Sequence, residues 1–201
     1  MVRLLVVLAL IALVVALLVP AIERARSQAD LALCKDHLRQ IGQELSQYAR
    51  INDGSLPVSA TIDGPQPELL AGLTACRCLG DPANYYCPAQ RTGSLSFSDD
   101  NFKAGVIGYY YYSATEASAK PDLSKFLRQG VTWPRKLTSS MDPKTWIMSD
   151  VWISGEPTAH SGFRKGVNYL MLDGSVDFIG ESPRQAFHWL GQYGSRLHWR
   201  R

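Results

Sequence analysis

The sequence predicts an α+β protein in which one long N-terminal helix packs on a small antiparallel β-sheet. An unbroken apolar run opens the chain, an amphipathic helical stripe follows it, and a hairpin signal lies near the C-terminus. The 201 residues, 46% hydrophobic and 19% charged, suit one globular domain with an anchor. The net charge of +3 is too small to indicate a nucleic-acid partner.

The first segment is apolar enough to cross a membrane. From Leu4 to Ile22 the sequence has no charged residue, and at 1.5 Å per residue it nearly covers the ~30 Å hydrocarbon core of a bilayer. A cleaved signal peptide is the alternative. Its apolar core is shorter, about 7–15 residues, and Pro20 and Glu23 stand where its cleavage site would lie. We therefore expect residues 1–22 to be a retained anchor.

The orientation of this anchor follows from the cysteines more than from the flanking charges. Arg3 precedes the apolar segment and Arg24 and Arg26 follow it, so the positive-inside rule discriminates little. Four cysteines in a small domain fit an oxidising compartment. The expected localisation is the inner membrane, single-pass, with the N-terminus in the cytoplasm and the globular domain in the periplasm or outside the cell.

Residues 23–53 are expected to continue the helix as an amphipathic stalk. Apolar residues three and four positions apart share one helical face, and here they are Leu31, Cys34, Leu38, Ile41, Leu45 and Tyr48. Pro20 predicts a kink, and Gly42 is tolerated at a small cost. Asn52, Asp53 and Gly54 predict the end of the helix. The stripe covers fewer than about three heptads, which favours packing on a sheet over a coiled coil.

Residues 54–201 are expected to form the globular domain. Short helices are predicted at residues 68–76 and 182–190, and either a short helix or a surface loop at residues 121–129. Strands are predicted at residues 105–113, 145–151, 167–172 and 175–179, and a polar loop at residues 91–101. Asp173 and Gly174 predict a two-residue hairpin turn, whose two positions both need a positive φ.

Three stretches together resemble the type IV pilin and type II secretion pseudopilin superfamily, in particular the planctomycete-type pseudopilin-like proteins with a C-terminal His…Asp-Gly signature. They are the apolar helix at residues 4–26, the cysteine-to-proline block at residues 34–57, and residues 160–179. Sixteen residues of this chain lie at positions of the family motifs, and all but Arg3 match the motif. They are Arg3, Pro20, Cys34, Leu38, Ile41, Gly42, Tyr48, Asn52, Gly54, Pro57, Cys87, Pro88, His160, Asn168, Asp173 and Gly174.

The resemblance implies a pilin-like fold and a structural role in a type II secretion or type IV pilus-type apparatus. Other pilin-like subunits, copies of this chain included, are the implied partners. Cys34 and Cys87 match the two family cysteines, so a disulfide between helix and sheet is implied; Cys76 and Cys78 would be left over, and other pairings stay open.

The chain departs from the family at two positions. Arg3 stands where the family has a glutamate that neutralises a neighbouring subunit's N-terminal amine, which leaves prepilin-peptidase processing and filament assembly open. Ser175 replaces a histidine. The alternative function is an anchored or secreted domain that binds an envelope polymer or carbohydrate. The aromatic residues Tyr109 to Tyr112, Trp133, Trp146 and Trp152 could line its surface, although strand packing explains them equally.

No pattern in the sequence predicts an enzyme or a cofactor. His160, Ser161 and Asp173 contain the residue types of a hydrolase, but no G-x-S-x-G turn presents a nucleophile. Cys76 and Cys78 lack the spacing of a zinc knuckle. Oxygen ligands for calcium could come from Asp99, Asp100 and Asn101, yet their spacing matches no EF-hand, and a solvated loop is favoured.

Overall fold

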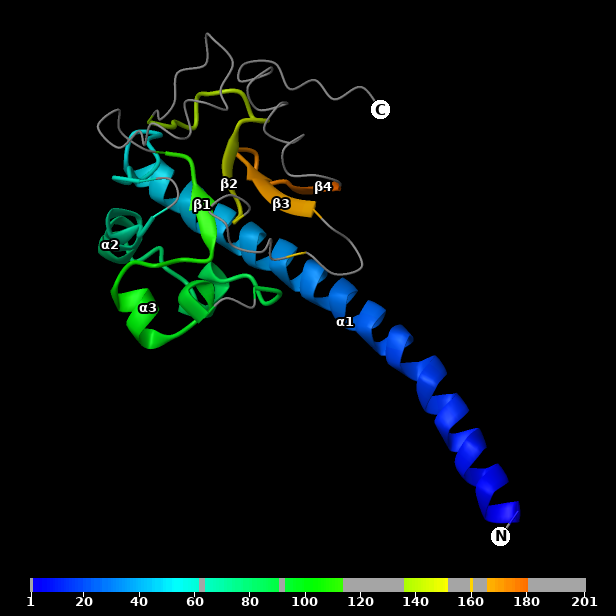
Figure 1. Ribbon diagram of the computed structural model, residues 1–201. Coiled ribbons are helices and arrows are strands. Elements are labelled where there is room, and N and C mark those ends of the chain that lie inside the picture. The colour runs from blue at the N-terminus through cyan, green and yellow to red at the C-terminus, as the bar shows by residue number, and fades with distance from the viewer. Residues whose placement is uncertain are drawn as a thin grey trace, which may run out of the picture.

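The computed structural model describes residues 2–61, 64–90, 93–113, 136–151, 160 and 166–180 (Figure 1). A long helix α1 extends away from a compact mixed domain, as the expected α+β class requires. The helices are α1 (Val2–Ile51), α2 (Pro67–Ala75) and α3 (Asp99–Lys103), with short 3-10 turns η1 (Pro82–Tyr85) and η2 (Gly93–Leu95). The strands are β1 (Tyr109–Tyr111), β2 (Trp146–Asp150), β3 (Gly166–Met171) and β4 (Val176–Gly180).

Helix α1 changes character halfway along its length. Its 50 residues span about 75 Å at 1.5 Å per residue, and Pro20 lies inside it without interrupting it. The apolar side chains described before Leu31 are exposed, whereas those facing the domain afterwards are buried: Leu31, Cys34, Leu38, Ile41, Leu45 and Ala49. The predicted stripe is confirmed except at its end, where Tyr48 is half-buried and Ala49 takes the buried position.

The helix ends where the turn signal places it. The residues after Ile51 reverse the chain, with a positive φ at Asp53 (50°) and at Gly54 (75°). The Gly54 N–H donates to the carbonyl of Ala49 at 2.8 Å, which satisfies one of the free carbonyls at the helix C-terminus.

The four strands form one antiparallel sheet in the order β1-β2-β3-β4. The second half of α1 packs on this sheet against β3 and β4, and its other side contacts η1 and α2 (Figure 1). Strands β1, β2 and β3 are buried along their whole length. The core therefore lies between the stalk half of α1 and the sheet.

Two local predictions need correction. The turn between β3 and β4 has three residues, Leu172 to Gly174, and only Gly174 has a positive φ, of 79°. This is a type I turn followed by a left-handed residue, so the hairpin exists but its two-residue Asp-Gly turn does not. The expected loop at residues 91–101 instead contains η2 and the start of α3, because the Ser98 side chain accepts from the Asn101 N–H and caps that helix.

The other expected elements are present where the structure describes the chain. Helix α2 matches the helix expected at residues 68–76, and β1, β2, β3 and β4 match the four expected strands within a few residues. The helix or loop expected at residues 121–129 and the helix expected at residues 182–190 lie outside the described residues, as do Trp133 and Trp152.

A buried carboxyl links α1 to η1. Glu44 is almost fully buried on α1 and accepts a short hydrogen bond from the Tyr85 hydroxyl. Burial raises the pKa of Glu44, although hydrogen bonds from Tyr85 and from the Gly80 N–H act in the opposite direction. The folded protein therefore holds the Glu44 proton more tightly than the unfolded chain does.

We expect Glu44→Gln to remove a pH dependence of stability. A carboxyl whose pKa is raised by folding costs stability as pH increases from the ordinary glutamate pKa to the raised one, since the folded state binds more protons in that interval. Glutamine keeps an oxygen that can accept from Tyr85. Urea unfolding between about pH 4 and pH 7 should show the variant gaining stability relative to the wild type as pH rises. The exposed-site control Glu68→Gln should follow the wild type, and equal slopes for Glu44→Gln and wild type would contradict the expectation.

Candidate metal centre

Four side chains able to ligate a metal meet inside the domain. Cys34, Cys87, Asp150 and His160 each place one ligand atom within 4.8 Å of those of the other three. All four are buried, with exposed fractions of 0% for Cys34, 2% for Cys87, 1% for Asp150 and 5% for His160. Such a set inside a core is unusual, because charged and ionisable groups are rarely buried unless they are paired.

Separate parts of the chain supply the four residues. Cys34 lies on the buried stripe of α1, one turn before Leu38, and Cys87 follows η1, which packs on α1. Asp150 is the last residue of β2. His160 forms an isolated antiparallel bridge with Gly166 at the start of β3, where the Gly166 N–H donates to the His160 carbonyl at 3.2 Å. The cluster thus joins the stalk helix to the sheet.

Direct contacts connect the four side chains. The Cys34 thiol donates to Oδ1 of Asp150 at 3.0 Å, and Sγ of Cys87 lies 3.5 Å from Nε2 of His160. Nε2 of His160 lies 3.4 Å from Oδ2 of Asp150. The Tyr109 hydroxyl, on β1, lies 3.4 Å from Sγ of Cys34.

Asn168 on β3 holds the carboxylate of Asp150 in place. Its backbone N–H and its side-chain Nδ2 donate to Oδ2 of Asp150, at 2.7 and 2.9 Å. Its Nδ2 also lies 2.9 Å from Nε2 of His160. Its Oδ1 is buried and has no hydrogen-bond partner among the described residues. The polar network around Asp150 is therefore incomplete at one atom.

The environment shifts the protonation of all four groups. Burial raises the pKa of the Cys34 thiol and of the Asp150 carboxyl. A hydrogen-bond interaction with Cys34 lowers the pKa of the Cys87 thiol, although burial opposes that shift. Burial lowers the pKa of His160, but the hydrogen bond to Cys87 and the negative charge of Asp150 outweigh it, and the net pKa is raised.

This arrangement permits metal binding or thiol oxidation more readily than catalysis. Reactive cysteines are at least partly exposed, whereas both sulfurs here are buried. The contact between Cys87 and His160 therefore does not provide an accessible nucleophile. The donor set of two sulfurs, one imidazole and one carboxylate is of a kind that transition metals bind.

The cysteines pair differently from what the family resemblance implies. The structure joins Cys76 to Cys78, the two residues that the implied pairing leaves over. Cys34 and Cys87 are free thiols, although they lie side by side in the cluster. The expected disulfide between helix and sheet is therefore wrong: the two cysteines are neighbouring thiols, and Cys87 lies on the loop after η1 and not in the sheet.

Of the three hydrolase residue types, the two that the structure describes, His160 and Asp173, have different partners. Asp173 forms a surface ion pair with Nζ of Lys144 at 2.6 Å, at the turn between β3 and β4. His160 is buried beside Asp150 instead. Ser161 lies outside the described residues.

The calcium candidates belong to a helix start. Asp99 and Asp100 form the first turn of α3, and both are exposed. The side-chain amide of Asn101 donates to the carbonyls of Gly93 and Ser96. Asn101 thus braces the preceding chain, and the two carboxylates satisfy the usual preference for acidic residues at a helix N-terminus.

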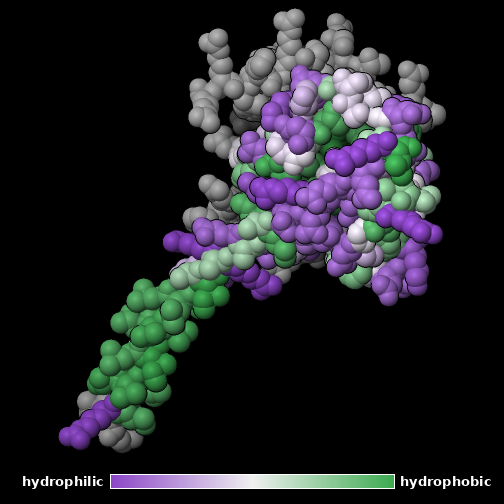
Figure 2. Space-filling model, turned by 180° about the vertical axis from the view of Figure 1, so that it is seen from behind, coloured by the Kyte–Doolittle hydropathy of each residue, from purple (hydrophilic) through white to green (hydrophobic). Residues whose placement is uncertain are grey.

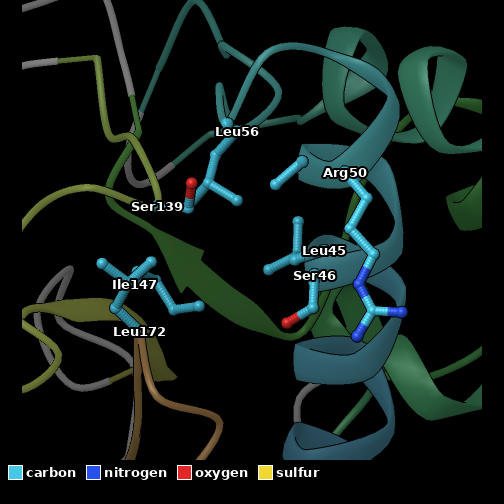
Figure 3. Close-up of a pocket in the computed structure, with 9 residues that line it drawn as sticks. Leu45, Ser46, Arg50, Leu56, Ser139, Ile147 and Leu172 are labelled. Atoms are coloured by element: carbon cyan, nitrogen blue, oxygen red, sulfur yellow. The ribbon is translucent and has the colours of Figure 1, made fainter.

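A shallow recess at the C-terminal end of α1 is a second possible binding place (Figure 3). Apolar side chains of Leu45, Leu56, Ile147 and Leu172 line it, and Arg50 lies along its helical wall. Among the described lining residues Arg50 is the one that carries a charge, and Ser46 and Ser139 add hydroxyl groups. One cation and two hydroxyls in a mainly apolar lining do not specify a ligand class.

Comparison with protein-family models, with curated proteins and with solved structures finds no significant match for this chain. The cluster must therefore be interpreted from its own chemistry. Sequence reasoning identified Cys34, Cys87 and His160 as motif positions but assigned no metal ligand, and it missed Asp150. The sequence did contain one signal that could have identified Asp150. It is a carboxylate within the apolar strand pattern of residues 145–151, and a buried carboxylate needs a partner.

Proposed function

We propose that this chain is a pilin-like structural subunit that is anchored in the inner membrane by the first half of α1. The observation that carries the proposal is the division of α1 into an exposed apolar half and a buried amphipathic half. Figure 2 shows the exposed half as a continuous hydrophobic stem below a mainly polar domain. One element thus serves two environments, as a pilin-like helix does.

The exposed stem needs an apolar surrounding. No side chain in its most apolar stretch is buried by the domain, and exposed residues occur on all its sides, for example Leu8, Leu10, Ile11 and Leu13. Monomeric soluble proteins rarely expose apolar patches larger than a few hundred Å². A bilayer supplies the missing contact, and a helix satisfies its own backbone hydrogen bonds there.

Assembly with other subunits is the finer part of the proposal. Neighbouring stems of the same kind would pack in the plane of the membrane, with the domains outside the cytoplasm. Arg3 is exposed near the helix start, where a long side chain reaches the aqueous interface. The component would be structural in a type II secretion or type IV pilus-type apparatus.

The alternative is an anchored domain that binds an envelope polymer and does not assemble. Its sequence support was the group of aromatic residues. The described members of that group are buried: Tyr109 to Tyr112 lie in the core, and Trp146 stacks on Tyr169 with ring centroids 4.1 Å apart. Strand packing accounts for them, which favours the structural role.

Cross-linking through single introduced cysteines tests the assembly proposal. Leu17→Cys and Ile22→Cys place thiols on the exposed stem, at positions 68% and 62% exposed. In membranes, oxidation or a short bis-maleimide should give dimers and higher multimers of these variants. The native thiols of Cys34 and Cys87 are buried and should stay unreactive under native conditions.

The matched control places the thiol on the domain surface. Phe97→Cys is 46% exposed and far from the stem in sequence. We expect it to cross-link much less than the stem variants. Monomers alone for all three variants would contradict assembly and favour the non-assembling alternative. Equal cross-linking of the stem and domain variants would indicate non-specific contact and would also contradict it.

A further inference from the structure

The cluster of Cys34, Cys87, Asp150 and His160 has the composition of a closed transition-metal site. Zinc is bound in proteins by thiolate, imidazole and carboxylate ligands, usually four in a tetrahedral arrangement when the site is structural. Calcium and magnesium prefer six or more oxygen ligands, and only Asp150 offers a carboxylate here. We propose that these four residues bind one Zn²⁺ ion that fixes the stalk half of α1 to the sheet.

The distances between ligand atoms suit this ion. Bonds of ~2.3 Å to sulfur and ~2.0 Å to nitrogen or oxygen, at tetrahedral angles, place neighbouring ligand atoms roughly 3.3–3.8 Å apart. Sγ of Cys87 and Nε2 of His160, two of the ligand atoms, are 3.5 Å apart. The hydrogen-bonded contact between Cys34 and Asp150, at 3.0 Å, would lengthen slightly when the thiol proton leaves.

The surrounding groups leave Oδ1 of Asp150 usable, and Nε2 of His160 becomes usable once the Asn168 amide nitrogen, 2.9 Å from it, turns away. Oδ2 of Asp150 receives two hydrogen bonds from Asn168, so Oδ1 is the oxygen free for the ion once Cys34 has lost its proton. Asn168 is a positioning residue, since it orients the carboxylate without ligating. Such outer partners orient first-shell ligands and affect metal affinity.

A purely hydrogen-bonded core explains the cluster less well. A buried polar network stabilises a fold when every member is satisfied, whereas Oδ1 of Asn168 has no partner among the described residues. All four side chains also place a ligand atom within 4.8 Å of those of the other three, which packing alone does not require. The cluster is therefore better explained as a set of ligands than as a set of packing residues.

A Cys34–Cys87 disulfide is the second rival. Such a disulfide would use the two sulfurs and leave Asp150 and His160 as a buried pair. It would not explain why these two side chains lie next to the sulfurs. The Cys76–Cys78 pair shows that this chain has another place for a disulfide. The presence of an imidazole and a carboxylate within ligand distance of both sulfurs favours the metal.

The test uses the full-length protein purified in detergent without chelators, and measures zinc per chain by elemental analysis. The Cys76→Ser/Cys78→Ser background is decisive, since Cys34 and Cys87 are then the only cysteines of the four that remain. We expect one equivalent of zinc in this background. Exchange with Co²⁺ should give tetrahedral ligand-field bands and sulfur-to-cobalt charge-transfer absorption, which requires no variant of the site itself.

Substitutions in the cluster should remove the ion. Cys34→Ser/Cys87→Ser and His160→Ala should lose the stoichiometric zinc, whereas His37→Ala, a histidine of the same helix as Cys34, should retain it. Asn168→Ala should keep the ligands but weaken zinc affinity by about 10- to 100-fold in chelator competition. Circular dichroism identifies any variant that fails to fold. If a cluster variant does not fold, the cobalt spectrum of the Cys76→Ser/Cys78→Ser protein, whose cluster is intact, tests the site instead.

Three results would overturn the proposal. They are a Cys34–Cys87 disulfide in protein alkylated directly in its membranes, cobalt without sulfur charge transfer in the Cys76→Ser/Cys78→Ser background, or zinc retained by Cys34→Ser/Cys87→Ser. The zinc site depends on the domain alone, so its failure would leave the anchoring and assembly proposals unaffected, and the reverse also holds.

Discussion

Leu38→Ala is expected to lower the free energy of unfolding by about 2–5 kcal/mol. Leu38 is fully buried on α1, between Cys34 and Ile41 on the stripe that packs on the sheet. Truncation removes apolar contacts on both sides and leaves a cavity that rigid strands cannot close. Because typical domains are stable by only 5–15 kcal/mol, a loss of this size is a large fraction of the total.

Urea unfolding of the full chain in detergent measures this loss. Leu33→Ala is the matched control, since it deletes the same atoms from the same helix at a position that is 46% exposed. We expect the control to change stability by less than about 0.5 kcal/mol. A similar loss for both variants would mean that α1 does not pack on the sheet as described.

Charges introduced into the stem should release the protein from membranes. An arginine at the centre of a membrane helix costs about 2.5–3.5 kcal/mol on insertion scales, so Leu10→Arg/Leu13→Arg should cost roughly 5–7 kcal/mol. Both positions are 57% exposed in the apolar stem. Alkaline extraction of membranes should move most of the double variant from the pellet to the soluble fraction.

The control uses the same kind of substitution on the same helix. Leu33→Arg/Ile51→Arg introduces two arginines at exposed positions beyond the stem, 46% and 63% exposed. This control should remain in the membrane pellet with the wild type. Retention of Leu10→Arg/Leu13→Arg in the pellet, at the level of the control, would contradict anchoring by the stem.

Periodicity was enough to predict much of this fold. The spacing of Leu31, Leu38 and Ile41 predicted the buried face of α1, because a helix repeats every 3.6 residues whatever it packs against. The apolar runs around Asp173 and Gly174 predicted the hairpin for an equally local reason. The error in its turn is local too: Gly174 alone adopts a positive φ, and the loop has one more residue than the Asp-Gly rule gives.

The cluster could not be predicted in the same way. The contact between Cys34 and Asp150 joins residues 116 positions apart, and it exists only when helix and sheet have docked. No spacing rule links Cys87, on a loop after η1, to a strand end. The resemblance identified three of the four residues, but it implied a disulfide, and only the folded arrangement adds the carboxylate.

The residues at the start of α3 show a different limit of prediction from the sequence. Residues 91–101 are mainly polar, and on that ground they were expected to be a loop. Ser98 nevertheless caps a short helix, and Phe102 packs partly against the core. A single capping side chain and one tertiary contact decide a five-residue helix, and periodicity cannot detect either.

Because α1 is one continuous helix, the direction of each side chain on its stem is fixed relative to the globular domain. Each residue turns the helix by ~100°, so steps of three and four residues counted back from Leu31 lead to Leu17 and Leu13, with a drift of about 20° per heptad. Those side chains point approximately toward the side on which the globular domain lies. The domain cannot swivel independently of its anchor. The side of the stem that packs against neighbouring subunits inside the bilayer therefore determines the direction in which the globular domain faces outside the bilayer.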